Sequence, residues 1–211
     1  MPFFTKPSSD KSDESDLSDQ SDQSDSSDLS QPTKTMNKNE LRKEIRSRKR
    51  QYTKEQLCEL SAPIIDRLRN HPKLVAAETV MLYHSLPDEV FTHNFVDEMV
   101  KAGKKVVLPV VISETEMEIR CYTGEKDMAE SSFHILEPIG ELFTDYASID
   151  FIAVPGMSFD AQCNRLGRGK GYYDRFLNQV PNAYKLGICF DFQKLETIPA
   201  DEYDKKVDEV L

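Results

Sequence analysis

Residues 149–156 read I-D-F-I-A-V-P-G, and residues 164–177 read N-R-L-G-R-G-K-G-Y-Y-D-R-F-L. The first stretch is an apolar run ended by Pro-Gly, which is typical of a buried strand. The second places a glycine-rich loop directly before a segment with helical spacing at residues 172–178. A buried strand, a glycine loop and a helix in this order indicate an α/β layer structure.

The same alternation of strand and helix patterns runs through the rest of the chain. Asn37-x-x-Glu40 and Thr53-x-x-Gln56 have capping-box spacing, which predicts two helix starts. Thr92 is expected to cap a third helix, which Gly103 ends. The second helix is expected to run to about Arg69 with the apolar face Leu57, Leu60, Ile64 and Leu68. Further strands are predicted at residues 78–84, 105–110, 117–122 and 185–190.

These patterns predict one α/β domain with three layers, in which helices flank a largely parallel or mixed central sheet. Ligands of such sheets bind beside the carboxyl ends of the strands. We therefore expect the binding site among the loops that follow Tyr83, Val154 and Phe190.

Residues 1–35 have a different composition. Ser-Asp recurs every three residues from Ser9 to Asp28, and the segment carries −5 of the chain's net charge of −10. Such a segment buries too little apolar surface to offset the entropy of ordering. We expect a disordered acidic tail at residues 1–35, with phosphorylation of its serines as an open alternative, and the α/β domain at residues 36–211.

Composition excludes several classes of protein. The remaining chain is also acidic, which argues against non-specific nucleic-acid binding. No apolar run reaches the length of a membrane span, and the first residues lack the apolar core of a signal peptide, so a cytoplasmic protein is expected. The cysteines are far apart and are expected mostly as buried small hydrophobes in a reducing compartment: Cys58, Cys121, Cys163 and Cys189.

The glycine loop has the spacing G-x-G-x-G, which is neither the Walker nor the dinucleotide pattern. Its free backbone N–H groups, together with Arg165, Arg168 and Lys170, favour a polyphosphate cradle. Of the adjacent Tyr172 and Tyr173, we expect one to stack on a ligand and one to pack into the core, because neighbouring helical side chains diverge by about 100°.

Several other charged residues could have either a structural role or a role in ligand binding. Asp174 is either a surface carboxylate or a Mg²⁺ ligand beside the phosphates. Lys38 and Arg42 share a helix face and could reach one anion. The loop at residues 85–89 is either a plain turn or the source of a carboxylate for a heterocycle. Arg46, Lys49 and Arg50 are expected to be solvated, with contact to a polyglutamate tail as the alternative.

Four motifs in this order resemble the 5-formyltetrahydrofolate cyclo-ligase family: K-N-E-L-R at 38–42, L-P-D-E-V at 86–90, V-P-G-M-S-F-D at 154–160 and R-L-G-R-G-K-G-Y-Y-D at 165–174. The resemblance spans about Met36–Leu211. It implies a monomeric ligase of one-carbon metabolism that takes the small molecules MgATP and a reduced folate, and no nucleic acid or membrane. In the implied reaction, phosphorylation of the formyl oxygen precedes closure of the 5,10-methenyl ring.

The resemblance also implies roles for individual residues. The catalytic residues would be Arg168, Lys170 and Tyr172. Mg²⁺ would contact Asp174 and Asp204, and the folate would contact Glu89 and His84. ATP would be bound by Lys38, Asn39, Glu40, Leu41, Arg42, Arg165, Leu166, Gly167, Arg168, Gly169, Lys170, Gly171, Tyr172 and Tyr173.

Two other classes of function compete with this reading. A catalytically silent nucleotide- or folate-binding regulator would be expected to lack a charged residue of the loop, yet all are present. An unrelated small kinase would need a general base near an acceptor hydroxyl, and no motif indicates one.

Overall fold

Both predicted capping boxes begin helices in the computed structural model, which describes residues 36–130 and 136–211. The Asn37 side chain accepts hydrogen bonds from the backbone N–H groups of Asn39 and Glu40, and the Glu40 side chain accepts from Asn37 N. Thr53 and Gln56 form the same reciprocal pair. The first box satisfies three backbone donors and the second satisfies two, which a helix start would otherwise leave free. The described α-helices are α1 (Lys38–Lys49), α2 (Lys54–Arg69), α3 (Pro72–Ala76), α4 (His93–Lys101) and α5 (Tyr172–Leu177).

The strands belong to three sheets within the described residues. The central sheet has the strand order β11-β9-β6-β1-β2-β3, and all its neighbours are parallel except β2 and β3, which form an antiparallel hairpin. The bounds are β1 (Thr79–Met81), β2 (Lys105–Val111), β3 (Met117–Tyr122), β6 (Phe151–Pro155), β9 (Tyr184–Ile188) and β11 (Glu209–Val210). The two smaller sheets contain β4 (Met128–Glu130) with β5 (Leu136–Pro138), and β7 (Ser158–Asp160) with β8 (Arg165–Leu166) and β10 (Lys194–Leu195).

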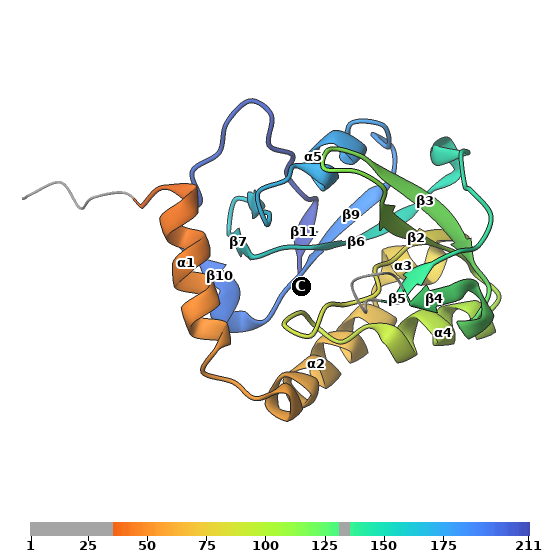
Figure 1. Ribbon diagram of the computed structural model, residues 1–211, viewed down its shortest axis with the longest axis horizontal. Coiled ribbons are helices and arrows are strands. Elements are labelled where there is room, and N and C mark those ends of the chain that lie inside the picture. The colour runs from red at the N-terminus through yellow and green to blue at the C-terminus, as the bar shows by residue number, and fades with distance from the viewer. Residues whose placement is uncertain (1–35, 131–135) are drawn as a thin grey trace, which may run out of the picture. The chain divides into compact units, whose positions relative to one another are not determined.

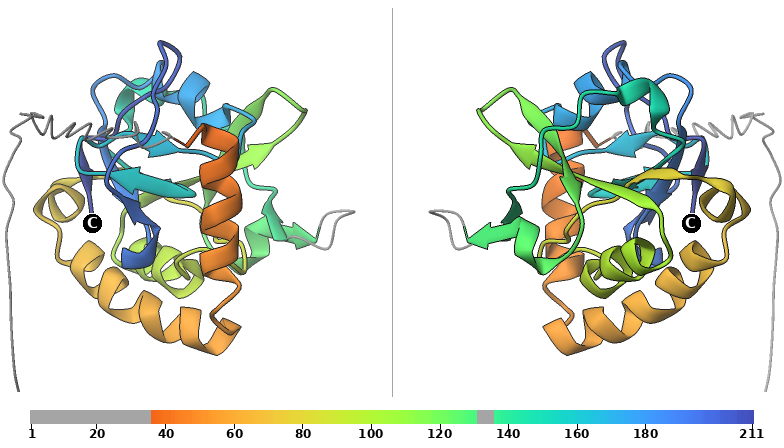
Figure 2. Two further views of the ribbon diagram at one scale, coloured as in Figure 1. Left: turned by 90° about the vertical axis from the view of Figure 1, so that its left-hand side faces the viewer. Right: turned by 90° about the vertical axis from the view of Figure 1, so that its right-hand side faces the viewer.

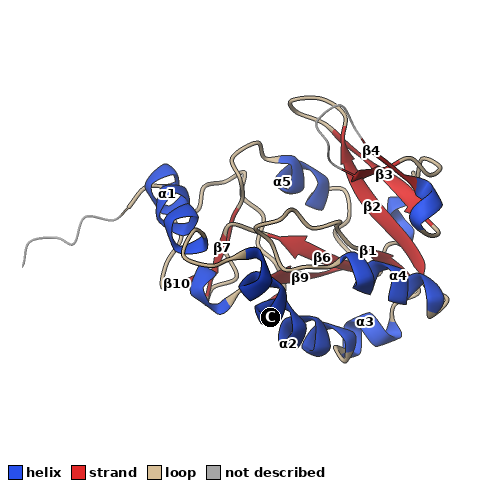
Figure 3. Cartoon of the chain, turned by 60° about the horizontal axis from the view of Figure 1, so that its bottom comes forward, coloured by secondary structure: helices blue, strands red, loops and turns tan. Residues whose placement is uncertain are grey.

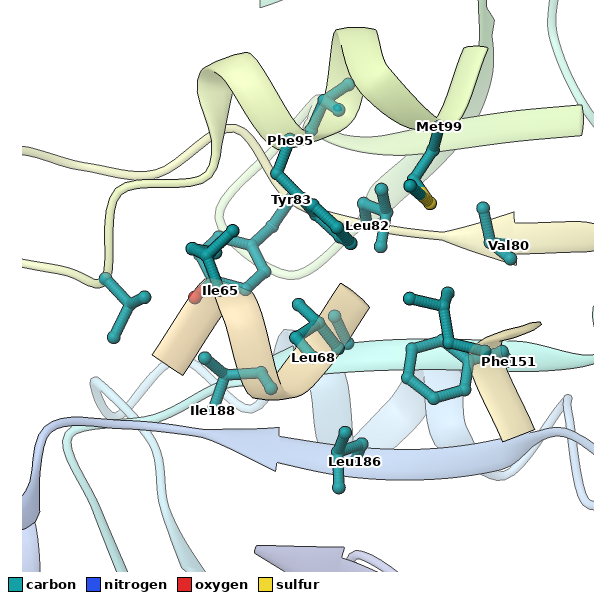
Figure 4. Packing of buried hydrophobic residues seen from close by; sticks show 14 of the residues in the cluster. Ile65, Leu68, Val80, Leu82, Tyr83, Phe95, Met99, Phe151, Leu186 and Ile188 are labelled. Atoms are coloured by element: carbon teal, nitrogen blue, oxygen red, sulfur yellow. The ribbon is translucent and has the colours of Figure 1, made fainter. Parts of the chain in front are cut away.

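The strands of the central sheet bury both faces, as a parallel sheet between helices requires. In β1 and β6, Val80 and Phe151 join the cluster that contains α2, α3 and α4, whereas Met81 and Ile152 join the cluster that contains α5. Figures 1 and 3 show α2 and α4 on one side of the sheet and α5 on the other. The first cluster, drawn in Figure 4, joins side chains of α2 and α4 to those of β1, β6 and β9. The predicted three-layer fold with a mixed sheet is confirmed.

Helix α1 packs beside the small sheet of β7, β8 and β10 (Figures 1 and 2). Leu41 and Ile45 on α1 are buried against Met157 and Leu166. Since β8 leads into the glycine loop, this apolar contact brings the basic face of α1 next to that loop.

Local patterns missed or misplaced several features. Leu60 is 39% exposed, because Ser61 and Ile65 take the inward positions of α2 beside the other predicted residues. Thr92 is the N-cap residue of α4, as predicted, but its side chain makes no capping hydrogen bond, since its hydroxyl donates to Tyr83 O. Helix α3 and the β4–β5 hairpin were not predicted. Of the strand predicted at residues 78–84, only Thr79–Met81 (β1) forms a strand. Of the four cysteines, which are all free thiols, Cys189 is buried as predicted, whereas Cys58 is exposed and Cys121 and Cys163 are half-buried, contrary to prediction.

Residues 36–130 and 136–211 contain no helix long and apolar enough to span a bilayer. The expected disorder of the acidic tail concerns residues 1–35, which lie outside the described residues.

Candidate functional site

The glycine loop lies between β8 and α5 and depends on backbone conformations that favour glycine. Gly169 has φ +107° and Gly171, the residue before α5, has φ +69°. A Cβ atom on Gly171 would stand 2.8 Å from Arg175 Nη1. The Arg175 side chain can move away from such an atom, but the positive φ would strain most other residues, so the turn into α5 favours glycine.

A cavity of about 610 Å³ lies along one side of this loop. Its volume is within the usual range for small-molecule sites. Three segments line it: the start of α1, the stretch from β8 into α5, and residues 201–205. The lining residues are Lys38, Arg42, Arg165, Leu166, Gly167, Gly169, Gly171, Asp174, Arg175, Asn178, Asp201, Glu202, Tyr203, Asp204 and Lys205.

The α1 cations reach this cavity as their spacing predicted. Arg42 Nε donates to Gly167 O at 2.9 Å and so joins α1 to the glycine loop. Lys38 Nζ pairs with Asp201 at 2.6 Å and also with Asp204. Burial lowers the pKa of Lys38, but its hydrogen bonds to the two carboxylates outweigh this and leave the pKa raised. An entering anion would therefore meet a charged lysine.

The other residues of the K-N-E-L-R motif have structural roles. Asn39 Oδ1 accepts from Arg42 Nη1 at 2.7 Å, Glu40 completes the capping box, and Leu41 is buried in the core. None of the three lines the cavity. Of the five motif residues predicted to bind ATP, the structure brings Lys38 and Arg42 to the loop.

Both predicted metal ligands line the same cavity. Asp174 Oδ2 accepts from Arg165 Nη2 at 2.9 Å, and its Oδ1 accepts from Lys205 N at 3.2 Å. Asp204 pairs with Lys38. No group of three or more His, Cys, Asp or Glu side chains in the described part of the chain has metal-binding geometry. Two carboxylates beside a phosphate cradle nevertheless fit Mg²⁺, which commonly takes one or two carboxylates and completes its shell with phosphate oxygens and water.

A second cavity of about 110 Å³ lies on the other side of the loop. It is lined by Glu89, Pro155, Gly156, Arg165, Gly167, Arg168, Lys170, Gly171, Tyr172 and Tyr173. Arg165, Gly167 and Gly171 line both cavities, so the two spaces adjoin across the loop. The loops after β1 and β6 contribute residues here, which agrees with the expected position at the carboxyl ends of the strands.

Arg165 is the central cation of the two cavities. Its side chain is only 4% exposed and pairs with Asp174, while its guanidinium carbon lies 5.4 Å from the centre of the Tyr173 ring. Its Nε has no hydrogen-bond partner in the described structure. A buried donor without a partner is costly unless a ligand or water satisfies it, which marks this position as a point of ligand contact.

The two tyrosines have different surroundings. The Tyr172 hydroxyl donates to Ser113 O at 2.8 Å, and the Arg175 guanidinium lies 5.5 Å from its ring centre. The Tyr173 hydroxyl is buried with no partner among the described residues, and burial, followed by the charge of Glu89, raises its pKa. The Tyr172 hydroxyl is thus already bonded to the tip of the β2–β3 hairpin, whereas the Tyr173 hydroxyl is available to a ligand within the described structure.

Arg168 and Lys170 point to different partners. Arg168 Nη2 donates to Asp88 at 2.6 Å and to Glu89 at 2.9 Å. Lys170 is 57% exposed, and its Nζ lies 3.5 Å from the carboxylate of Glu114. Lys170 therefore has the freedom to reach a ligand at the mouth of the small cavity.

Of the two predicted folate contacts, Glu89 lines the small cavity and His84 lines neither cavity. The His84 ring stacks on His93 with 3.4 Å between ring centres. Burial, and then the nearby His93, lowers the pKa of His84 to about 4.

The expectation that Arg46, Lys49 and Arg50 of the first helix are solvated is wrong for Lys49. Arg46 and Arg50 are exposed, but the Lys49 side chain is 4% exposed and donates to Asp88. Sequence reasoning also missed the cavity residues Arg175, Asn178, Asp201, Glu202, Tyr203 and Lys205. Asp201 and Glu202 belong to an acidic run near the C-terminus, which was the one available signal.

Comparisons with known proteins agree with this architecture. The model of the 5-formyltetrahydrofolate cyclo-ligase family matches residues 34–211. The 5-formyltetrahydrofolate cyclo-ligase of Mus musculus is 31% identical over 187 residues, which cover 82% of this chain and 92% of that protein. The NMR structure of Aquifex aeolicus 5,10-methenyltetrahydrofolate synthetase has a TM-score of 0.72 at 35% identity and covers 83% of this chain and 89% of that one. The synthetase from Mycoplasma pneumoniae has a TM-score of 0.67 at 30% identity, with coverages of 83% and 98%.

Proposed function

The chain belongs to the 5-formyltetrahydrofolate cyclo-ligase family, and from this premise we propose that it converts 5-formyltetrahydrofolate and ATP into 5,10-methenyltetrahydrofolate, ADP and phosphate. The single observation that carries the proposal is the pair of cavities that adjoin across the glycine loop. The larger one has room for a nucleotide and the smaller one for the reacting end of a second substrate. Arg165, Gly167 and Gly171, which both cavities share, would then lie where the terminal phosphate meets that substrate.

The reaction needs two bond-forming steps. The formyl oxygen attacks the γ-phosphorus, the bond from that phosphorus to ADP breaks, and a phosphorylated imidate forms. N10 then attacks the imidate carbon and loses its proton, and the C–O bond breaks so that the oxygen leaves with phosphate. Phosphorylation is required because an amide oxygen is otherwise a poor leaving group.

The chain contributes position and charge to these steps. Lys38, Arg42 and Arg165 would hold the phosphates beside the loop, and Lys170 would neutralise charge on the phosphoryl group in flight. The Tyr173 hydroxyl would satisfy a polar atom of the reduced folate, and Glu89 would accept hydrogen bonds from its amino edge. Mg²⁺ held by Asp174 and Asp204 would screen the phosphate oxygens.

The direct test is absorbance in the methenyl-folate band after the protein is mixed with 5-formyltetrahydrofolate and MgATP. We expect growth of the band that requires ATP and stops when EDTA removes Mg²⁺. No growth from folded protein that still binds ATP would contradict the proposal and favour a silent binding protein.

Lys170→Ala tests the role of the exposed lysine. Loss of one preorganised charge partner of a transition state costs about 2.7–4 kcal/mol, so kcat is expected to fall about 10²–10³-fold. Folding should be unaffected because the side chain is exposed. Lys43→Ala, which removes an exposed lysine of α1 that lines neither cavity, is the matched control. Turnover of Lys170→Ala equal to that of the control would rule out the assigned role.

A further inference from the structure

Four charged side chains from distant parts of the chain form one network beside the small cavity. Lys49 comes from the end of α1, Asp88 and Glu89 come from the loop after β1, and Arg168 comes from the glycine loop. The network therefore joins the loop that would hold the folate to the loop that would hold the phosphates.

Asp88 is fixed in place by Lys49. Lys49 Nζ donates to Asp88 O at 2.6 Å and to Asp88 Oδ2 at 3.1 Å. Burial lowers the pKa of Lys49, and the charge of Asp88 acts in the opposite direction. A lysine is rarely buried without a paired charge, so its position here depends on Asp88. The other oxygen, Asp88 Oδ1, accepts from Arg168 Nη2 at 2.6 Å.

Glu89 has little capacity left for another donor. Its Oε1 accepts from both Nε and Nη2 of Arg168, at 3.2 and 2.9 Å, and its Oε2 accepts from Leu86 N at 3.1 Å. A carboxylate offers about four acceptor sites. The Glu89 side chain is 11% exposed, so few directions of approach are open. A ligand that presents one N–H group to each oxygen of Glu89 must displace an N–H group of Arg168 from Oε1.

We propose that Arg168 is shared between the two substrates: Glu89 holds it in the free protein, and a folate that binds Glu89 releases it toward the phosphates of ATP. During this change Asp88 keeps its hydrogen bond to Nη2 of Arg168, and Lys49 holds Asp88 in position. Lys49 and Asp88 are thus positioning residues of the reaction. The inference rests on the proposed function, because it takes Glu89 as a folate contact.

Sharing one cation couples the two binding equilibria. The folate frees Arg168 for phosphate, and ATP draws Arg168 from Glu89, so each substrate favours the binding of the other by the same factor. Such coupling between sites is commonly about 5–150-fold. We expect the affinity for an unreactive ATP analogue to rise by a factor in this range when 5-formyltetrahydrofolate is present.

The first test needs no folate. Calorimetry measures binding of the β,γ-imido analogue of ATP with Mg²⁺ to the full chain and to Glu89→Gln. The neutral amide holds Arg168 less strongly, so the variant is expected to bind the analogue several-fold more tightly than the original chain. Glu116→Gln removes an exposed carboxylate that lines neither cavity but lies near Tyr172, and it controls for a general change in charge near the loop. Equal or weaker binding by Glu89→Gln, or an equal gain in the control, would overturn the inference.

The second test measures the coupling itself. The Kd of the same analogue is determined with and without 5-formyltetrahydrofolate, for the original chain and for Asp88→Asn. We expect the ratio of the two Kd values to fall toward one in Asp88→Asn, even if both ligands still bind. A loss of stability alone would not change this ratio, because both Kd values describe the folded protein. An unchanged ratio in Asp88→Asn, or a ratio of one in the original chain, would overturn the inference.

The two tests separate this inference from the proposed function. If the original chain binds the analogue but not the folate, the proposed function fails, and the comparison of Glu89→Gln still shows whether Glu89 restrains Arg168. If the chain makes 5,10-methenyltetrahydrofolate and shows no coupling, the proposed function stands and the shared-arginine inference fails.

Discussion

Tyr173 carries a buried hydroxyl beside the small cavity that has no hydrogen-bond partner within residues 36–130 and 136–211, whereas the hydroxyl of its neighbour Tyr172 donates to Ser113 O. An unsatisfied buried hydroxyl destabilises the free protein and becomes useful when a ligand accepts its hydrogen bond. The residue expected from the motif to take part in catalysis was Tyr172. The hydrogen bonds of the two hydroxyls instead favour Tyr173 as the tyrosine that would contact the substrate.

The two tyrosines are therefore expected to respond differently to the same change. Tyr173→Phe should lower kcat/KM by about 5- to 12-fold, which corresponds to one hydrogen bond of about 1–1.5 kcal/mol, and should leave the melting temperature unchanged or raised. Tyr172→Phe should have the smaller effect on kcat/KM. Steady-state rates and thermal melts of both variants check this. A larger loss of kcat/KM in Tyr172→Phe would return the catalytic role to Tyr172.

His84 should make stability depend on acid pH. Its pKa is lowered from 6.5 to about 4 by burial and by His93, with Asp97 acting in the opposite direction. The unfolded chain therefore takes up this proton first as pH falls. The contribution to stability is complete above pH 6.5 and is lost as pH falls toward 4. It is at most about 3 kcal/mol, and less because solvent screens the partly exposed ring.

The measurement is the free energy of unfolding between pH 7.5 and 4 for the original chain and for His84→Phe, which keeps an aromatic ring against His93. The original chain should lose more stability over this range than the variant does. Parallel pH profiles would show that His84 is not the group responsible.

At the scale of elements, the contact between β7 and β9 depends on glycine. Phe159 in β7 is fully buried, and a Cβ atom on Gly187 in β9 would lie 2.7 Å from its ring atom Cε1. A Cβ on Gly156 would lie 2.6 Å from Cε2 of the same ring. The ring thus lies against two glycines. Since β7 pairs with β8, which leads into the glycine loop, this packing also supports the site.

Gly187→Ala is expected to force the Phe159 ring to move. Overpacking of this kind costs about 1–3 kcal/mol, which in a chain of this size lowers the melting temperature by about 2–12 °C. Phe159→Leu in the same chain should recover part of the loss, because it removes the atoms that clash. Thermal melts of the two single variants and the double variant check the coupling. Additive losses would show that the ring and the added methyl do not meet.

At the scale of the whole molecule, residues 36–211 contain every core cluster of the described structure, from Leu41 in the smallest cluster to Leu211 in the largest. We predict that a chain of residues 36–211 folds by itself with an unchanged melting temperature and unchanged turnover. Comparison of the two chains by thermal melt and by the methenyl-folate assay checks the division at residue 35. A lower melting temperature or slower turnover would show that residues 1–35 contribute to the domain.

Most of the fold followed from local patterns. Capping boxes and apolar periodicity predicted the four longer segments of helix and the inner strands, because these signals depend on neighbours a few residues away. Leu60 was misplaced because several apolar residues of α2 compete for the inward face, and only the packing against the sheet selects among them. The short α3 and the β4–β5 hairpin have too few residues to show a period.

Sequence motifs predicted many residues of the candidate site, but they did not predict which charged side chains pair with one another. Local spacing predicted the glycine loop, the shared helix face of Lys38 and Arg42, and the carboxylate Asp174, because residues a few positions apart express these features. Asp204 was predicted only from the resemblance to the family. By contrast, no pattern in the sequence indicated that Lys49 pairs with Asp88, 39 residues away, or that Arg168 pairs with Glu89, 79 residues away; these contacts form only in the folded chain. Such contacts depend on the order of the strands and on the path of the chain between them, and no local pattern of residues records that path.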